Sequence, residues 1–313
     1  MTWLITGGAG YIGSHVVDYF FSKKESIIVM DNLLSGSRLN IEGKCTFIKG
    51  DISNNSILQE IFINHEIEGV VNLAALKSVS ESALIPEEYR RINSIAAANL
   101  INESVKHGVD IFVQSSTAAV YGNLDSGIAR EDSELAPISV YGKTKVEAEI
   151  ALSTQVNQKK IKGISLRYFN VVGAKSEPLK DTSKANLFPI VMEAIGKKQA
   201  PQIFGDDYPT PDGTCIRDYV HVQDIARAHF LAADALRKRQ TATHLNLGTG
   251  QGYSVREIMA RILTHRGSSL EPLIKPRREG DPAKLVAEIE LAGAELGYKP
   301  EFGLDEMVAS TFF

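Results

Sequence analysis

The chain has 313 residues, of which 43% are hydrophobic and 23% are charged, and this excludes a disordered, collagen-like or coiled-coil protein. The net charge of −4 argues against a dedicated nucleic-acid-binding protein, because such proteins carry a basic excess. Cys45 and Cys215 form neither a disulfide framework nor a zinc-ligand spacing, so we expect no metal site. No apolar run reaches roughly 18 residues and no charged leader precedes the first one, so we expect a cytoplasmic protein without membrane association.

Short apolar runs alternate with longer amphipathic stretches through the first half of the chain. We expect buried strands at residues 2–6, 26–31, 45–49, 69–73, 109–115 and 162–168. We expect helices at residues 11–22, 54–64, 86–107 and 139–156. Strands that alternate with helices indicate βαβ units, so the sequence predicts an α/β fold with a Rossmann-type doubly wound parallel sheet.

The second half is less regular, because residues 171–220 are rich in glycine and proline. A helix at about 223–238 and a strand at 244–247 follow this region and are expected to rejoin the first sheet. We therefore predict that residues 1–170, rejoined by about 215–250, form a Rossmann-type domain. Residues 171–313 are expected to form a smaller, mixed α/β substrate-binding domain.

A glycine-rich segment, TGGAGYIG, follows the first strand and opens the first helix. Glycines at this position permit a tight turn and close approach of the backbone to a pyrophosphate, which the helix N-terminus attracts. Asp31 ends the second strand 18 residues after Gly13, where a carboxylate reads the ribose 2′-hydroxyl and favours NAD over NADP. Arg38 is the nearest basic residue downstream, and it leaves NADP open. Asp51, after the third strand, fits either an adenine contact or an ordinary loop aspartate.

Tyr141 and Lys145 lie four residues apart in the predicted helix 139–156, so their side chains share one face. A nearby ammonium and an oxidised nicotinamide would both favour tyrosinate and make the tyrosine a better base. Ser115, Ser116 and Thr117 end the preceding strand, where open α/β sheets bind their ligands. This pattern predicts a site that moves a proton and a hydride beside a bound NAD.

At these residues the chain resembles the extended short-chain dehydrogenase/reductases, and among them most of all the family of UDP-glucose 4-epimerases. The matching segments are TGGAGYIGSH, NLAALKSVSES, SSTAAVYG, YGKTK, LRYFNVVGA, IFGDDYPTPDGTCIRDYVHVQDIA, HLNLGTGQGYSV and KPRREGDP. The resemblance implies that Tyr141 is the base, Lys145 supplies positive charge and Thr117 assists. The residues it implies for the cofactor site are Gly7, Gly10, Tyr11, Ile12, Gly13, Asp31, Asn32, Asp51, Ile52, Leu73, Ala74, Ala75, Lys77, Asn93, Ser115, Tyr141, Lys145 and Tyr168.

The resemblance also implies a UDP-sugar site. Its residues are Lys77, Thr117, Tyr141, Asn170, Asn186, Leu187, Phe204, Arg217, Tyr219, Arg278, Asp281 and Leu285. The implied reaction oxidises the sugar at C4, lets the 4-keto sugar turn in the pocket, and returns hydride to its other face. The expected pair is UDP-glucose and UDP-galactose. Leu285 stands at the position that controls access of N-acetyl sugars, so these stay open as further substrates.

Other functions stay open beside this one. A nucleotide-sugar dehydratase needs an acid and a base where this chain has Ala118 and Ala119, which disfavours elimination. Epimerases for uronic acid or pentose nucleotides are harder to exclude. A non-catalytic NAD-sensing protein would lack the pair of Tyr141 and Lys145, and both residues are present here. Family members commonly pair through the helices at 86–107 and 139–156, so the resemblance implies a homodimer.

Overall fold

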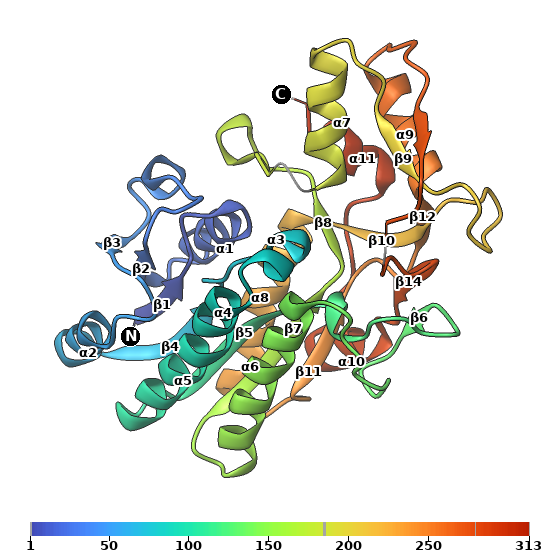
Figure 1. Ribbon diagram of the computed structural model, residues 1–313. Coiled ribbons are helices and arrows are strands. Elements are labelled where there is room, and N and C mark those ends of the chain that lie inside the picture. Colours follow the sequence, from blue (N-terminus) through green and yellow to red (C-terminus); the bar gives the residue numbers. More distant parts are fainter. Residues whose placement is uncertain (1, 184–185, 279, 313) are drawn as a thin grey trace.

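The computed structural model of the chain describes residues 2–183, 186–278 and 280–312. Its largest element is a seven-stranded parallel sheet with the strand order β11-β7-β5-β4-β1-β2-β3 (Figure 1). These strands are β1 (Thr2–Thr6), β2 (Ser26–Asp31), β3 (Thr46–Lys49), β4 (Ile67–Asn72), β5 (Ile111–Thr117), β7 (Lys162–Tyr168) and β11 (His244–Leu247). The order reverses direction at β1, as in doubly wound sheets, and the predicted fold class is confirmed.

Helices cover both faces of this sheet, which explains why its strands read as unbroken apolar runs. On one face lie α1 (Tyr11–Ser22), α8 (Val222–Lys238) and α10 (Glu290–Leu296). On the other lie α2 (Asn55–Asn64), α5 (Ala97–Lys106) and α6 (Val140–Asn157), with α5 and α6 in front of the sheet in Figure 1. In α1, the spacing of Val16, Val17 and Phe20 places them on one fully buried face.

The helix predicted at 86–107 is composed of three segments in the structure. It begins with α4 (Pro86–Tyr89), continues as the π-helical segment η2 (Arg90–Ala96) and ends with α5. A short helix, α3 (Val79–Leu84), precedes it. The sequence pattern does not separate π from α geometry, because both present an apolar face at similar spacing.

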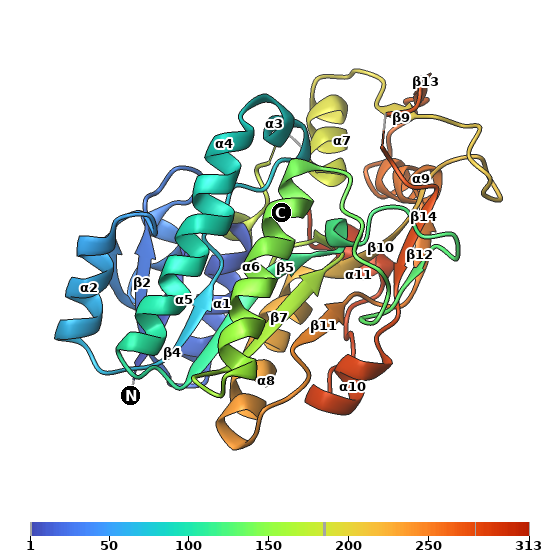
Figure 2. The ribbon, with the colours of Figure 1, turned by 60° about the horizontal axis from the view of Figure 1, so that its bottom comes forward.

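A second group of elements lies beyond the carboxyl ends of the parallel strands (Figure 2). Its main sheet has the order β12-β10-β14-β6, with β8 also paired to β10. These strands are β6 (Ile128–Ala129), β8 (Asn170–Val172), β10 (Ile216–His221), β12 (Gly252–Ser254) and β14 (Lys284–Ala287). Strand β10 therefore belongs to this smaller sheet, whereas α8 and β11, which follow it, return to the large one.

Three helices and one strand pair complete the second group. They are α7 (Leu187–Gly196), α9 (Val255–His265), α11 (Leu304–Ala309), β9 (Gln202–Phe204) and β13 (Leu273–Lys275). The short helical turns that remain in the described part of the chain are η1 (Arg38–Ile41), η3 (Ala118–Val120) and η4 (Glu177–Leu179). None of the helices within the described residues combines the length and apolar character that a membrane span needs.

Candidate active site

The glycine-rich loop between β1 and α1 has the tight backbone that a pyrophosphate site requires. Gly7 has φ +69°, and a Cβ there would lie 2.6 Å from the backbone nitrogen of Ala74. A Cβ on Gly13 would lie 2.1 Å from the carbonyl oxygen of Gly7. Gly10 caps α1 with no side-chain hydrogen bond, so the first backbone N–H groups of α1 are left for an anion. The loop therefore fits the pyrophosphate of a dinucleotide.

Acidic side chains follow β2 and β3 next to this loop. Asp31 is buried, and its two carboxylate oxygens accept hydrogen bonds from the backbone N–H groups of Ala9 (3.0 Å) and Leu33 (2.7 Å). Asp51 accepts from the Asn32 side chain at 2.8 Å and from the backbone of Ser53 at 2.9 Å. Burial alone would raise the pKa of Asp51, but these hydrogen bonds outweigh burial and lower it. Two carboxyl groups thus lie where a ribose hydroxyl would be held, and Ile52 is buried beside them.

The loop after β4 approaches the glycine loop and carries Leu73, Ala74, Ala75 and Lys77. The Asn93 side chain fixes it, accepting from the Leu76 backbone N–H and donating to the Leu76 carbonyl oxygen, each at 2.8 Å. Lys77 is half-exposed, and its ammonium lies 3.8 Å from the carboxylate of Asp181. A cation on this loop therefore faces the segment that leads from β8 to α7.

The first turns of α6 bring the predicted proton-transfer residues to the end of β5. Ser139 caps the helix by accepting from the Gly142 N–H at 3.0 Å, and the Tyr141 N–H donates to the Ser82 hydroxyl at 3.2 Å. Lys145 Nζ donates to the Ser115 carbonyl oxygen at 3.1 Å and lies 3.2 Å from its hydroxyl. The same ammonium is 6.0 Å from the centre of the Tyr141 ring.

Burial shifts the pKa values of both Tyr141 and Lys145. Burial raises the pKa of Tyr141 to about 12, against a hydrogen bond with Thr117 that lowers it. Burial lowers the pKa of Lys145 to about 8, against the Glu149 carboxylate, which raises it. Tyr141 is therefore a protonated phenol at neutral pH unless a further positive charge comes close.

The substrate-side residues face Tyr141 across one cavity of about 1270 Å³. The predicted residues that line it are Tyr11, Ile12, Lys77, Thr117, Tyr141, Tyr168, Asn170, Asn186, Leu187, Phe204, Arg217, Tyr219, Arg278, Asp281 and Leu285. The others lie behind its wall or around the glycine loop. They are Gly7, Gly10, Gly13, Asp31, Asn32, Asp51, Ile52, Leu73, Ala74, Ala75, Asn93, Ser115 and Lys145.

Positive charge and an aromatic ring also line this cavity. The Arg278 guanidinium stacks 3.9 Å from the centre of the Phe204 ring. Arg217, on β10, lies 3.5 Å from Asp281 and is paired in register with Leu285 of β14. Two guanidinium groups can hold a diphosphate through bidentate hydrogen bonds, and the ring offers a stacking surface for a base.

Other predicted residues have partners that narrow what their side chains can contribute. The Tyr168 hydroxyl lies 2.5 Å from His229 Nε2 on α8 and donates its proton there, because His229 Nδ1 donates to the Ile225 carbonyl oxygen. Asn186 occupies the N-cap position of α7 without a side-chain capping bond, and its amide donates to Asp181 at 2.5 Å. Tyr219 is buried, with its ring 5.9 Å from that of Phe188.

Sequence reasoning missed three polar residues around the site. Asp181 contacts both Lys77 and Asn186, but it lies in an irregular segment with no periodicity to mark it. Ser82 accepts from the Tyr141 N–H across a separation of 59 residues. Of the three, Glu149 could have been found from the sequence, because it lies one helical turn after Lys145 on the same face of the predicted helix.

Comparison with known proteins agrees with this geometry. Residues 3–248 match the sequence profile of the NAD dependent epimerase/dehydratase family. The chain belongs to this family. A relative named UDP-glucose 4-epimerase from Halalkalibacterium halodurans is 40% identical, over 98% of this chain and 93% of its own length.

Solved structures of family members have the same fold over the whole chain. The UDP-glucose 4-epimerase of Stenotrophomonas maltophila, with bound NAD and formylated UDP-arabinopyranose, has a TM-score of 0.95 at 37% identity, covering 100% of this chain and 97% of that one. The UDP-Glc/GlcNAc 4-epimerase of Campylobacter jejuni has a TM-score of 0.88 at 35% identity, covering 99% of this chain and 98% of that one.

Proposed function

We propose that this member of the NAD-dependent epimerase/dehydratase family is a UDP-glucose 4-epimerase that interconverts UDP-galactose and UDP-glucose on a tightly held NAD. One observation carries the proposal. The wall of a single cavity carries both Tyr141 and Thr117, which can act on a reacting hydroxyl, and Arg217 and Arg278, which can hold a diphosphate, as a nucleotide sugar requires. The names of the similar proteins support the same activity.

Each group of residues on the cavity wall has a role in the mechanism. NAD, when bound on the glycine loop, supplies a nicotinamide that accepts the hydride of sugar C4 and returns it. Tyr141, hydrogen-bonded to Thr117, accepts the proton of the C4 hydroxyl and later gives it back. Lys145 places an ammonium near the Tyr141 ring and so favours tyrosinate. Arg217 and Arg278 anchor the diphosphate while the 4-keto sugar presents its other face.

The experiment that tests the proposal is a coupled assay with a panel of UDP-sugars and no added NAD. We expect interconversion of UDP-galactose and UDP-glucose, and NAD released on denaturation in near-equimolar amount. A chain that converts neither sugar while holding NAD would refute the proposal. Release of a 4-keto-6-deoxy sugar would instead indicate a dehydratase, against which Ala118 and Ala119, both on the cavity wall, offer no acid or base.

UDP-N-acetyl sugars are a second substrate pair that one observation favours. Leu285 lines the cavity and is shorter than an aromatic gate, and the similar protein from Campylobacter jejuni is named for both kinds of sugar. We propose activity on UDP-N-acetylgalactosamine in addition to UDP-galactose. The same sugar panel measures the ratio of the two.

We also propose that the chain is a homodimer that pairs through η2, α5 and α6. Ile95 on η2 is 59% exposed and Ile150 on α6 is 58% exposed, so this face carries uncovered apolar side chains. Light scattering after gel filtration tests the state, and Ile150→Asp should yield a monomer. The division into an NAD domain of residues 1–170 and a UDP-sugar domain of residues 171–313, together with a cytoplasmic location, stays a prediction.

A further inference from the structure

The helix that carries Tyr141 makes three successive contacts with the end of β5. Tyr141 is hydrogen-bonded to Thr117, and Lys145 to Ser115. One turn further along, the Ser116 hydroxyl donates to the Glu149 carboxylate at 2.5 Å. Three helix positions at a spacing of four thus meet three consecutive strand residues. Glu149 is 1% exposed and lies outside the cavity wall, so it has no direct access to a ligand there.

Glu149 is held by a buried arginine from the neighbouring strand. Arg167 on β7 donates from Nε at 3.0 Å and from Nη2 at 2.7 Å, one bond to each oxygen of the Glu149 carboxylate. Its remaining nitrogen, Nη1, donates to the Tyr121 hydroxyl at 2.8 Å and to the Glu131 carbonyl oxygen at 3.2 Å. The arginine therefore joins α6 to the segment that follows β5.

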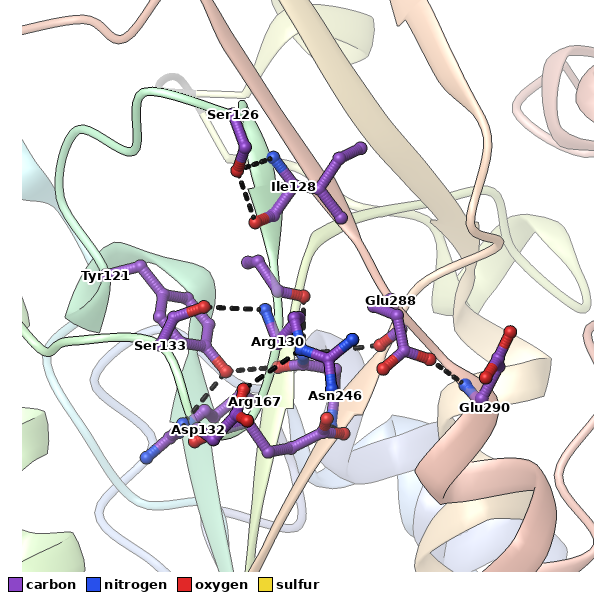
Figure 3. Close-up of polar contacts among 12 residues, drawn as sticks. Tyr121, Ser126, Ile128, Arg130, Asp132, Ser133, Arg167, Asn246, Glu288 and Glu290 are labelled. Atoms are coloured by element: carbon purple, nitrogen blue, oxygen red, sulfur yellow. Dashed lines mark hydrogen bonds and ion pairs between the residues drawn. The ribbon is translucent and has the colours of Figure 1, made fainter.

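Figure 3 shows how this contact continues into the smaller sheet. The Tyr121 hydroxyl donates to the Asn246 side chain at 2.6 Å. Asn246, on β11, donates from Nδ2 to the carbonyl oxygens of Ala129 at 3.0 Å and Glu288 at 3.3 Å. Ala129 ends β6, and Glu288 directly follows β14, the strand of Leu285. One polar chain thus runs from the helix of the base to the strand on the substrate side.

Stability alone does not explain a buried pair of this kind. Removing two charges from water costs several kcal/mol, and buried ion pairs can often be replaced by apolar residues without loss of stability. The pair instead lies where it can act on the site. Glu149 is one helical turn from Lys145, and Arg167 is linked through Tyr121 and Asn246 to Glu288, the residue that follows β14.

Resting on the proposed function, we propose that Glu149 and Arg167 are a positioning pair. They hold α6 on β5, so that Tyr141 and Lys145 stay in reach of Thr117 and Ser115. They also place a fixed negative charge one helical turn from the Lys145 ammonium. Neither residue lines the cavity, so their effect on proton transfer passes through Lys145 and Tyr141.

Charged and titratable groups surround this pair on several elements, and Tyr121 and Glu131, in the segment after β5, lie beside Arg167. On α6, Lys145 faces Glu149 on one side and Tyr141 on the other, with Tyr89 of α4 and Tyr168 of β7 near the Tyr141 ring. Glu149 faces Arg167 of β7, and the His244 ring of β11 has Nε2 at 3.4 Å from its carboxylate. Burial lowers the pKa of His244, so this ring is neutral at and above neutral pH. Glu149 is therefore the carboxylate whose charge acts on Lys145.

Glu149→Gln in the NAD-loaded chain removes the charge and keeps an oxygen for Ser116. We expect kcat to fall at least about tenfold at pH 8, with KM for UDP-galactose nearly unchanged, because positioning and not binding is lost. We expect the Lys145 titration midpoint, followed by ¹³C NMR of the lysine ε-carbons, to fall by at least about half a pH unit. The Lys145 signal is assigned as the one absent from Lys145→Met, and this readout does not depend on activity.

Two further variants separate the parts of the proposal. Ser116→Ala removes the contact with β5 but not the charge, so it should lower kcat and leave the Lys145 midpoint in place. Glu149→Gln with Arg167→Gln removes both charges, avoids an unpaired buried arginine and should restore folding, yet the midpoint should still be lowered. The matched control is Glu68→Gln. Glu68 lies in a half-buried cluster with Arg237 and Glu25 beside the amino end of β1, so this variant should leave kcat and the Lys145 midpoint unchanged.

The outcomes distinguish the two proposals. An unmoved Lys145 midpoint in both the single and the double variant, or a wild-type kcat in folded Glu149→Gln, would overturn the positioning pair. A wild-type chain that does not interconvert UDP-sugars overturns the proposed function instead, while the NMR titration still tests the pair.

Discussion

Replacing Tyr141 with phenylalanine should separate the chemistry of this site from its folding. The variant keeps the ring, whose centre lies 6.4 Å from that of Tyr89, and loses the hydroxyl with its hydrogen bond to Thr117. One such bond contributes about 1 kcal/mol to stability, which corresponds to a fall in Tm of a few degrees at most for a chain of this size. Loss of the general base costs about 10²- to 10⁴-fold in kcat, or roughly 3–5 kcal/mol in the activation barrier.

The assay measures three quantities on the same preparation. These are the turnover of UDP-galactose, the amount of NAD released on denaturation, and the Tm. We expect turnover to fall by at least about a hundredfold while bound NAD and Tm stay near wild type. Tyr298→Phe is the matched control, because it removes one buried hydroxyl that donates to the Gly248 carbonyl oxygen at 3.0 Å, away from the cavity wall. If Tyr141→Phe turned over at close to the wild-type rate, Tyr141 would not be the base and the mechanism would be refuted.

Three other changes test separate parts of the site. Gly13→Ala places a Cβ 2.1 Å from the Gly7 carbonyl oxygen, so the purified chain should contain little NAD by absorbance, and full retention would contradict the role of the loop. Leu285→Tyr should lower turnover of UDP-N-acetylgalactosamine relative to UDP-galactose, whereas an unchanged ratio would remove Leu285 as the gate. The Lys145 ammonium, with its pKa lowered to about 8, is present below that pH and lost above it, so kcat should decline as the pH rises through about 8. Lys145→Arg, which stays protonated, should move this decline to higher pH despite lower activity, and a decline at the same pH would show that another group titrates.

The large sheet was predictable because each of its strands is a local signal. Residues 2–6, 26–31 and 162–168 are strands with the predicted bounds. Strands buried on both faces appear as apolar runs, which can be recognised without knowing the strands that pair with them. The smaller sheet was not predictable in the same way. Strand β6 has two residues, Ile128 and Ala129, and exists because Val286 and Ala287 pair with them from far along the chain. No local pattern encodes such a pairing.

The candidate site likewise has a part that was predictable from local sequence and a part that was not. Tyr141 and Lys145 could be found because a spacing of four residues in a helix places both side chains on one face. Asp31 could be found because it ends a strand at a fixed distance in sequence from the glycine loop. That Lys77 faces Asp181, and that Arg167 binds Glu149, depends on how separate elements pack. Each of these pairs joins segments whose separation in sequence carries no regular spacing.

The cavity also explains how a chain with a net charge of −4 can bind a diphosphate. Arg217 is largely buried, so water screens its charge less than it would at the surface. Arg278 is exposed and lies over the Phe204 ring. Asp281 partly neutralises Arg217 until a diphosphate competes for it. Arg217 and Arg278 offer charge to the nucleotide, whereas Thr117 and Tyr141 offer the sugar hydroxyl groups only. The proposed reaction needs this contrast, because inversion at C4 requires a sugar that turns on a nucleotide that does not.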